Sequence, residues 1–251
     1  MTSSRSIKSL ILVIVFLPAV GYAKLPKPEK LPADSVFLVG EELYREGRFR
    51  KAVAYLNHFV LNYPVKAKVA LAQYHLANSY YRLKRFQEAS VEYEFLYKQF
   101  STSPFAEEAQ LKAAQATFEI SEPYYREQHL TLDSRRMAED FLTRYPNSEF
   151  SSQARDLLVR IENKLARKEL EAAKLYFKFK EYEAAIMMLE YTVGTYPLAS
   201  KVNAEINYYL ALSKAKLGEE EEAQAVLEEL LENPKWSKKA QKALDRLAKD
   251  K

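Results

Sequence analysis

Aromatic side chains that sit beside arginines could bind an extended peptide ending in a carboxylate. Tyr44 precedes Arg45 and Tyr81 precedes Arg82, and the same spacing places Phe118 at a matching position further along. Aromatic rings supply apolar contact area, and a guanidinium can hold a carboxylate through two parallel hydrogen bonds. The pattern predicts a peptide-binding groove built from Tyr44, Arg45, Tyr81, Arg82 and Phe118. The alternative is that the rings only pack between neighbouring helices, and their position in the pattern does not decide between the two.

Catalytic and metal chemistry are not indicated. The histidines His58, His75 and His129 have no metal-ligand spacing to one another. A nucleophile elbow, a phosphate loop and an HExxH string are all missing from the sequence. We therefore expect a protein that is not an enzyme and has no cofactor, no metal and no small-molecule substrate.

The elements that carry the aromatic residues repeat with the tetratricopeptide pattern of about 34 residues. In the first repeat the pattern is met by Gly40, Tyr44, Ala52, Phe59 and Pro64, and the small residues Gly40 and Ala52 are expected to let two helices approach closely. Five repeats are predicted, at about 33–66, 70–103, 107–147, 166–199 and 204–236. Since such helix pairs bury their apolar faces only by stacking, the predicted fold is an all-α, right-handed superhelical solenoid.

Two irregularities interrupt the repeats. The third repeat has extra residues in a loop at about 120–131, so its second helix is expected only from about Leu132. Residues 151–180 contain no Gly or Pro and keep helical apolar spacing, which predicts one long helix bridging repeats three and four. Residues 237–251 predict a basic C-terminal capping helix; contact of its basic face with anionic lipid headgroups is the alternative.

The N-terminal residues read as an export signal. Arg5 and Lys8 precede an apolar run that is too short to span a bilayer, and small residues follow, so residues 1–23 predict a cleaved signal peptide. Residues 24–32 contain three prolines and are expected to form an extended linker. The remaining chain carries a net charge of about +2, which does not favour nucleic acid as a partner, and the absence of cysteine leaves no thiol to carry a lipid.

Four sequence strings resemble the BamD family of the outer-membrane β-barrel assembly machinery: YREGRFRKAV (44–53), LTLD (130–133), RYPNSEF (144–150) and KLARKELEAAKLYFKFKEYEAAI (164–186). The resemblance covers roughly residues 33–234, and the interruption and the long helix occur where that family has them. It implies a non-catalytic periplasmic scaffold at the inner face of the outer membrane, monomeric within a hetero-complex.

The same resemblance implies two kinds of partner. The first repeats would capture the C-terminal β-strand signal of unfolded outer-membrane proteins, at Tyr44, Arg45, Tyr81, Arg82 and Phe118. The later repeats would dock the barrel-forming subunit and other members of the complex, at a surface that includes Lys164, Arg167 and Phe177.

The lack of cysteine, which departs from the BamD family pattern, keeps other functions open. Members of that family commonly carry a lipidated cysteine, which this chain lacks, so it is either held at the membrane by a partner or serves a different client. The alternatives are a periplasmic scaffold for cell-wall or envelope-constriction complexes, a secretin pilotin, or a regulatory module of a cell-wall hydrolase acting in trans.

Overall fold

The computed structural model describes residues 25–65 and 67–249, so the predicted signal peptide lies outside the described residues. The described chain is all-α, which confirms the predicted fold class, and no strand is present in it. Its eleven α-helices are α1 (Ala33–Arg45), α2 (Phe49–Asn62), α3 (Val69–Arg82), α4 (Phe86–Gln99), α5 (Ala106–Glu119), α6 (His129–Arg144), α7 (Ser151–Lys178), α8 (Tyr182–Thr195), α9 (Asn203–Lys216), α10 (Glu220–Glu229) and α11 (Ser237–Leu247).

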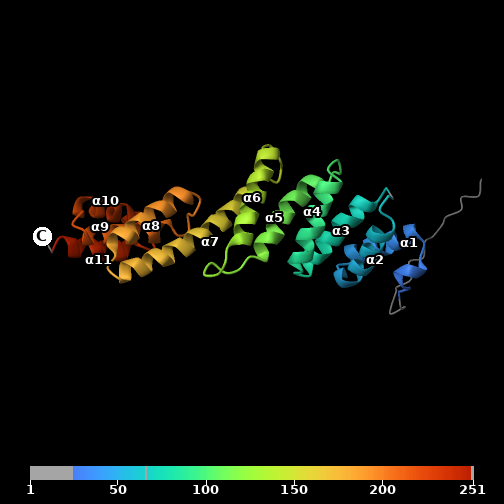
Figure 1. Ribbon diagram of the computed structural model, residues 1–251, viewed down its shortest axis with the longest axis horizontal. Coiled ribbons are helices and arrows are strands. Elements are labelled where there is room, and N and C mark those ends of the chain that lie inside the picture. The colour runs from blue at the N-terminus through green and yellow to red at the C-terminus, as the bar shows by residue number, and fades with distance from the viewer. Residues whose placement is uncertain (1–24, 66, 250–251) are drawn as a thin grey trace, which may run out of the picture.

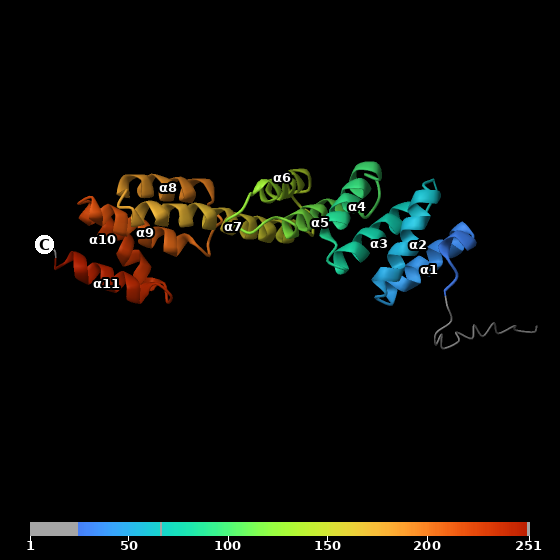
Figure 2. The ribbon, with the colours of Figure 1, turned by 60° about the horizontal axis from the view of Figure 1, so that its bottom comes forward.

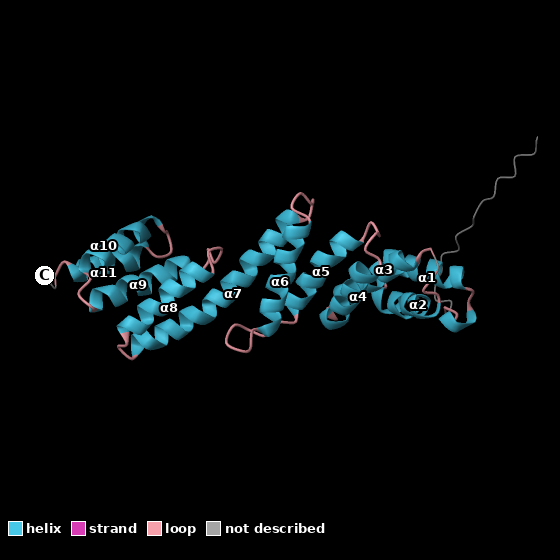
Figure 3. Cartoon of the chain, turned by 45° about the horizontal axis from the view of Figure 1, so that its top comes forward, coloured by secondary structure: helices cyan, strands magenta, loops and turns pink. Residues whose placement is uncertain are grey.

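Each helix packs against the next one in the sequence, and the result is an elongated array (Figure 1). Antiparallel helix pairs joined by short turns follow one another along the long axis (Figure 3). This is the arrangement expected of repeats that bury their apolar faces on their neighbours.

The turns inside four helix pairs share one backbone geometry. Gly47, Lys84, Lys180 and Gly218 all have positive φ angles, between 59° and 85°. In each turn the next residue donates its N–H to a carbonyl five residues earlier, as Arg48 does to Leu43 at 2.8 Å. This left-handed C-terminal cap reverses the chain, and it explains the glycines of the consensus at positions 47 and 218.

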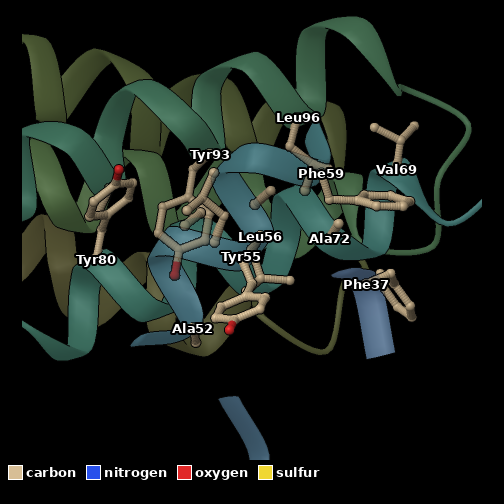
Figure 4. Packing of buried hydrophobic residues seen from close by; sticks show 14 of the residues in the cluster. Phe37, Ala52, Tyr55, Leu56, Phe59, Val69, Ala72, Tyr80, Tyr93 and Leu96 are labelled. Carbon is tan, nitrogen blue, oxygen red and sulfur yellow. The ribbon is translucent and has the colours of Figure 1, made fainter. Parts of the chain in front are cut away.

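The first core cluster joins α1 to α5 and includes Phe37, Leu56, Phe59, Tyr93 and Leu96 (Figure 4). Gly40 lies at the tightest contact between α1 and α2, because a Cβ there would meet Leu56 Cγ and Cδ2 at 3.0 Å. The small size of Gly40 and of the fully buried Ala52 thus allows α1 and α2 to approach closely, as expected from the sequence.

The residues before α1 are packed rather than extended. Pro28–Lys30 form one turn of 3₁₀ helix where an extended linker was expected, and the Tyr55 hydroxyl donates to the Pro26 carbonyl. Leu25 and Leu31 also contact the first core cluster. Proline fits this turn because the first helical residue donates no hydrogen bond within the helix.

The third helix pair and α7 depart from the regular repeat. Residues 120–128 connect α5 to α6, and α6 begins at His129, about three residues earlier than expected. The side-chain amide of the buried Gln128 donates to the Pro123 and Arg126 carbonyls at 2.8 and 3.1 Å and so orders this loop. The helix predicted over 151–180 spans Ser151–Lys178 in the structure, and α7 packs on α5 and α6 near its start and on α8 and α9 near its end (Figure 2).

The close approach at Gly40 leads to a test of packing. Gly40→Ala should lower the free energy of unfolding by about 1 kcal/mol, because overpacking costs about 1–3 kcal/mol and the better helix propensity of Ala returns at most about 1 kcal/mol. Denaturant unfolding followed by circular dichroism measures the change.

Gly194→Ala on α8 is the matched control, because nothing lies within 4 Å of a Cβ at that position. It should be neutral or stabilise the protein by up to about 1 kcal/mol. Equal effects of the two substitutions would contradict the packing argument.

Candidate functional site

A concave cavity of about 660 Å³ lies where α1, α3 and α5 meet; it is called the α1–α5 cavity below. Four of the five predicted groove residues line it together, namely Tyr44, Arg45, Tyr81 and Arg82. The remaining lining residues are Glu46, Gly47, Phe49, Tyr74, Asn78 and Lys112. Two neighbouring repeats therefore supply most of one site.

The tyrosine rings both pack and line the cavity. Tyr44 stacks on His75 with ring centroids 4.2 Å apart, and it meets Phe49 edge-on at 5.8 Å. Tyr81 meets Phe86 edge-on at 5.0 Å. Burial raises the pKa of both tyrosines, so the hydroxyls stay protonated and can donate to a ligand. The rings therefore pack within the chain and also face the cavity, and peptide binding there stays a prediction.

Positive charge dominates the rim of the α1–α5 cavity. Arg45, Arg82 and Lys112 line it, and Glu46 is the one carboxylate among its described lining residues. The Arg82 guanidinium lies 5.2 Å from the Phe49 ring centroid, and the Lys112 ammonium lies 5.9 Å from that of Tyr81. An anionic group would therefore find two cations already placed over aromatic faces. Arg45 and Lys112 also pair with Glu41 and Glu108, at 2.8 and 3.4 Å.

The floor of the cavity is held by hydrogen bonds between helices. The Tyr74 hydroxyl donates to the Glu108 carboxylate of α5, and the Tyr93 hydroxyl of α4 donates to Asn78 Oδ1 at 2.6 Å. Two residues that line the cavity, Tyr74 and Lys112, were not among those predicted from the sequence. Tyr74 lies seven residues before Tyr81, two helical turns away on the same face, so this spacing was a usable signal.

Phe118, the fifth predicted groove residue, does not line the cavity. It is half-buried on α5, where Arg160 and Lys164 of α7 lie 4.7 and 5.2 Å from its ring centroid. Arg160 also forms an ion pair of 2.7 Å with Glu119. The long helix thus occupies the place that a ligand would need at this repeat.

The three residues predicted for docking are engaged within the chain. Lys164 donates to the Ser121 hydroxyl at 2.7 Å, Arg167 pairs with Glu205 of α9 at 2.8 Å, and Phe177 meets Tyr209 edge-on at 5.6 Å. Lys164 therefore holds the loop after α5, whereas Arg167 and Phe177 hold α9. They set the position of α7 against its neighbours, and their part in docking stays a prediction.

Large apolar side chains are exposed nearby. Phe179, just after α7, is 64% exposed, and Met187 on α8 is 72% exposed. Leu175, Tyr176 and Tyr191 on the same two helices are also exposed. Exposed groups of this kind mark sites of protein contact more often than isolated apolar residues do.

The described part of the chain shows neither a metal-site cluster nor a membrane-spanning helix. No three His, Cys, Asp or Glu side chains are grouped there so that they could hold a metal ion. Among the same residues, no helix is long and apolar enough to cross a membrane.

Stacked helix pairs with a concave, aromatic and basic surface define a helical-repeat scaffold of the tetratricopeptide class. The chain belongs to the family described as "YfiO: Outer membrane lipoprotein", whose model matches residues 29–230. This is the BamD family suggested by the sequence strings, which confirms the resemblance. The family is non-catalytic, in agreement with the prediction that the protein is not an enzyme.

Individual relatives are distant. The chain is 25% identical to outer membrane protein assembly factor BamD of Rickettsia prowazekii over 88% of this chain and 72% of that protein. It is also 25% identical to the BamD of Haemophilus influenzae, over 77% of this chain and 78% of that protein. Among solved structures, the TPR2AB domain of yeast Sti1 in complex with pHSP90 is similar with a TM-score of 0.46 and 15% identity, covering 86% of each chain.

The family description refers to lipoproteins, and here this chain departs from it. Its 251 residues include no cysteine, so none of them can carry a lipid on a thiol.

The ion-pair network between α7 and α9 can be tested by pH. Burial raises the pKa of the Glu205 carboxyl, but hydrogen bonds from Arg167 and Lys174 outweigh this and hold the pKa below its ordinary value of 4.5. A lowered pKa contributes stability that is present above the unfolded-state value and is lost as the pH falls through the folded-state value. Glu205→Gln should therefore lower the free energy of unfolding by about 1–2 kcal/mol at pH 7, and the difference should shrink below about pH 4.

Glu46→Gln is the control, because Glu46 pairs with Arg48 at 2.8 Å on an exposed surface. It should change the free energy of unfolding by less than about 0.5 kcal/mol. A Glu205→Gln difference that stays constant down to pH 3 would contradict the assigned ion pairs.

Proposed function

We propose that this protein is a non-catalytic assembly factor for outer-membrane β-barrel proteins, working in the periplasm at the inner face of the outer membrane. Membership in the outer membrane lipoprotein family supports this role, as does the name of its curated relatives, outer membrane protein assembly factor. The mechanism is binding and positioning, without turnover.

The observation that carries the proposal is the α1–α5 cavity, where Tyr44, Arg45, Tyr81 and Arg82 meet. A client signal that ends in an aromatic residue and a free carboxylate matches this chemistry. Its ring would lie beside the tyrosines, and its carboxylate would pair with a guanidinium or with Lys112. Phe118 is left out of the proposed groove because Arg160 and Lys164 cover its ring.

Docking of the barrel-forming subunit is proposed for the C-terminal half. Three side chains would support docking by fixing α7 against the loop after α5 and against α9, namely Lys164, Arg167 and Phe177. The exposed side chains of Leu175, Phe179 and Met187 would supply the apolar contact area. Since no residue can carry a thiol-linked lipid, this contact would also hold the protein at the membrane.

Client recognition is tested with charge reversal in the α1–α5 cavity. Arg45→Glu with Arg82→Glu should weaken binding of a labelled peptide that ends in Phe with a free carboxylate by about tenfold or more, because each good charge pair contributes about a factor of ten. Fluorescence anisotropy measures the affinity, and circular dichroism checks that the variant is folded.

Arg50→Glu with Lys51→Glu is the matched control, because these cations lie on α2 beside the cavity without lining it. It should leave the affinity within about twofold, whereas amidation of the peptide C-terminus should weaken binding to the unmodified protein. Equal loss in both charge-reversed variants would reject the α1–α5 cavity as the binding site.

Partner docking is tested by purification of the full chain from envelope extracts in mild detergent. An outer-membrane β-barrel subunit with periplasmic repeat domains should co-purify, and Phe179→Asp with Met187→Asp should remove most of it, because burying a carboxylate at an apolar contact costs several kcal/mol.

Val65→Asp is the control for partner docking, because Val65 is exposed in the segment between α2 and α3. Those two helices lie far along the array from α8 (Figure 1). Recovery of cell-wall enzymes or envelope-constriction proteins in place of the barrel subunit would overturn the proposed function.

A further inference from the structure

The helices α9, α10 and α11 lie together at the C-terminal end (Figure 2). A second cavity, of about 510 Å³, is lined by residues of α9, the start of α10 and α11. Its floor is apolar and includes Tyr208, Leu212, Ala215 and Leu247. Its rim carries Lys216, Lys239, Lys242 and Arg246. This site, called the α9–α11 cavity, shares no residue with the α1–α5 cavity or with the exposed apolar side chains of α7 and α8.

The rim is strongly unbalanced in charge. Four cations face a single lining carboxylate, that of Glu220. Within the described residues, Lys216, Lys242 and Arg246 form no ion pair, whereas Lys214 on the same helix α9 contacts Glu190, Glu219 and Glu222. The chain thus pairs a neighbouring lysine with three carboxylates and provides none for Lys216, Lys242 and Arg246 within its described residues, whereas the Lys239 ammonium lies 4.2 Å from the Trp236 ring centroid.

The basic face of α11 is not explained by helix stability. Lys239, Lys242 and Arg246 lie three and four residues apart, so they are neighbours on one face, and like charges at this spacing destabilise a helix by about 0.2–0.5 kcal/mol per pair. A capping helix needs only a polar outer face, which mixed charges would provide at no such cost. Gathering cations around an apolar floor is what recognition of an acidic ligand requires.

A membrane surface fits this arrangement less well than a peptide does. The apolar side of α11 is already used inside the protein, since Ala240 and Ala243 are buried and Leu244 and Leu247 pack on the third core cluster. An interfacial helix would need those residues free to enter the lipid. In addition, the cations surround a concavity that can enclose a side chain, whereas headgroups present a flat layer of charge.

We propose that the α9–α11 cavity binds an acidic segment of a protein partner, with one aromatic or aliphatic side chain on the floor and Asp or Glu residues paired with the rim. The tyrosine faces and Leu212 supply the apolar contacts, and Arg246 can hold a carboxylate through two hydrogen bonds. The protein then has two peptide sites of different preference, one at each end of the array.

The test uses the full chain and a short fluorescein-labelled peptide in which Glu and Asp residues flank a central Phe-Leu pair. The unmodified protein should bind this peptide and should not bind its counterpart with Lys at every acidic position. Lys242→Glu with Arg246→Glu should weaken binding of the acidic peptide by about tenfold or more. Raising the salt concentration should weaken it as well, because the rim is exposed to solvent.

Two matched variants separate this site from general charge attraction and from the α1–α5 cavity. Lys235→Glu with Lys238→Glu makes the same charge change near and on α11 without touching the cavity lining, and it should leave the affinity within about twofold. Arg45→Glu with Arg82→Glu should also leave the affinity for the acidic peptide unchanged. The test of the α9–α11 cavity is therefore independent of the test of the proposed client site.

Three outcomes would overturn the proposal. Equal weakening by the cavity variant and by the Lys235→Glu, Lys238→Glu variant would mean general charge attraction. If circular dichroism shows that the Lys242→Glu, Arg246→Glu variant is folded and its affinity for the peptide is unchanged, the peptide binds elsewhere. Flotation with phosphatidylglycerol vesicles that depends on Lys242 and Arg246, without binding of the acidic peptide, would assign the surface to lipid.

Discussion

A buried carboxylate on α7 determines how the two halves of the array are joined. Glu162 is only 3% exposed, and its Oε2 accepts the N–H of Leu198, in the segment between α8 and α9, at 2.6 Å. Its Oε1 faces the Arg135 guanidinium of α6 at 3.5 Å, and the neighbouring Asn163 accepts the N–H of Lys201 at 2.8 Å. Because a buried charge must be matched by donors, one turn of α7 fixes both the helix before it and the connection after it. These contacts add to the apolar core that α7 shares with its neighbouring helices.

This arrangement suits a protein that positions its partners. In a helical-repeat array each unit contacts only its neighbours, so distant sites are related through the rigid helices between them. Here α7 alone covers 28 residues and packs on four other helices. The helices α1 and α3 lie toward one end of the array from α7, and α10 and α11 lie toward the other (Figure 1). Ligands held at both cavities would be kept at a defined separation, which raises their effective concentration toward one another without any chemistry by the chain. In the proposed role, such positioning is the whole mechanism.

The regular part of this architecture could be predicted from the sequence, because each consensus residue has a local physical reason. Gly47 and Gly218 stand where the turn needs a positive φ, and Gly40 stands where two helices touch. The departures come from contacts between residues far apart in sequence. Phe118 matches Tyr44 and Tyr81 in spacing, yet Arg160, more than forty residues later, covers its ring. The packing of Leu25 and Leu31 on the first core was likewise hidden in a proline-rich segment, since proline content reports backbone preference and not tertiary contact.

In the proposed role, the C-terminal half binds the partner at the membrane. A lipid chain would supply membrane affinity independently of any partner, whereas a docking contact would supply it through protein surface. Exposed apolar residues at the end of α7 and on α8 can supply buried area, and the cations of the α9–α11 cavity can supply selectivity and orientation. Both features lie beyond the turn of α7 that Glu162 fixes, so a partner bound there would hold the α1–α5 cavity at a set distance from the membrane. In the proposed role, attachment to the partner and client recognition would therefore occupy opposite ends of one array.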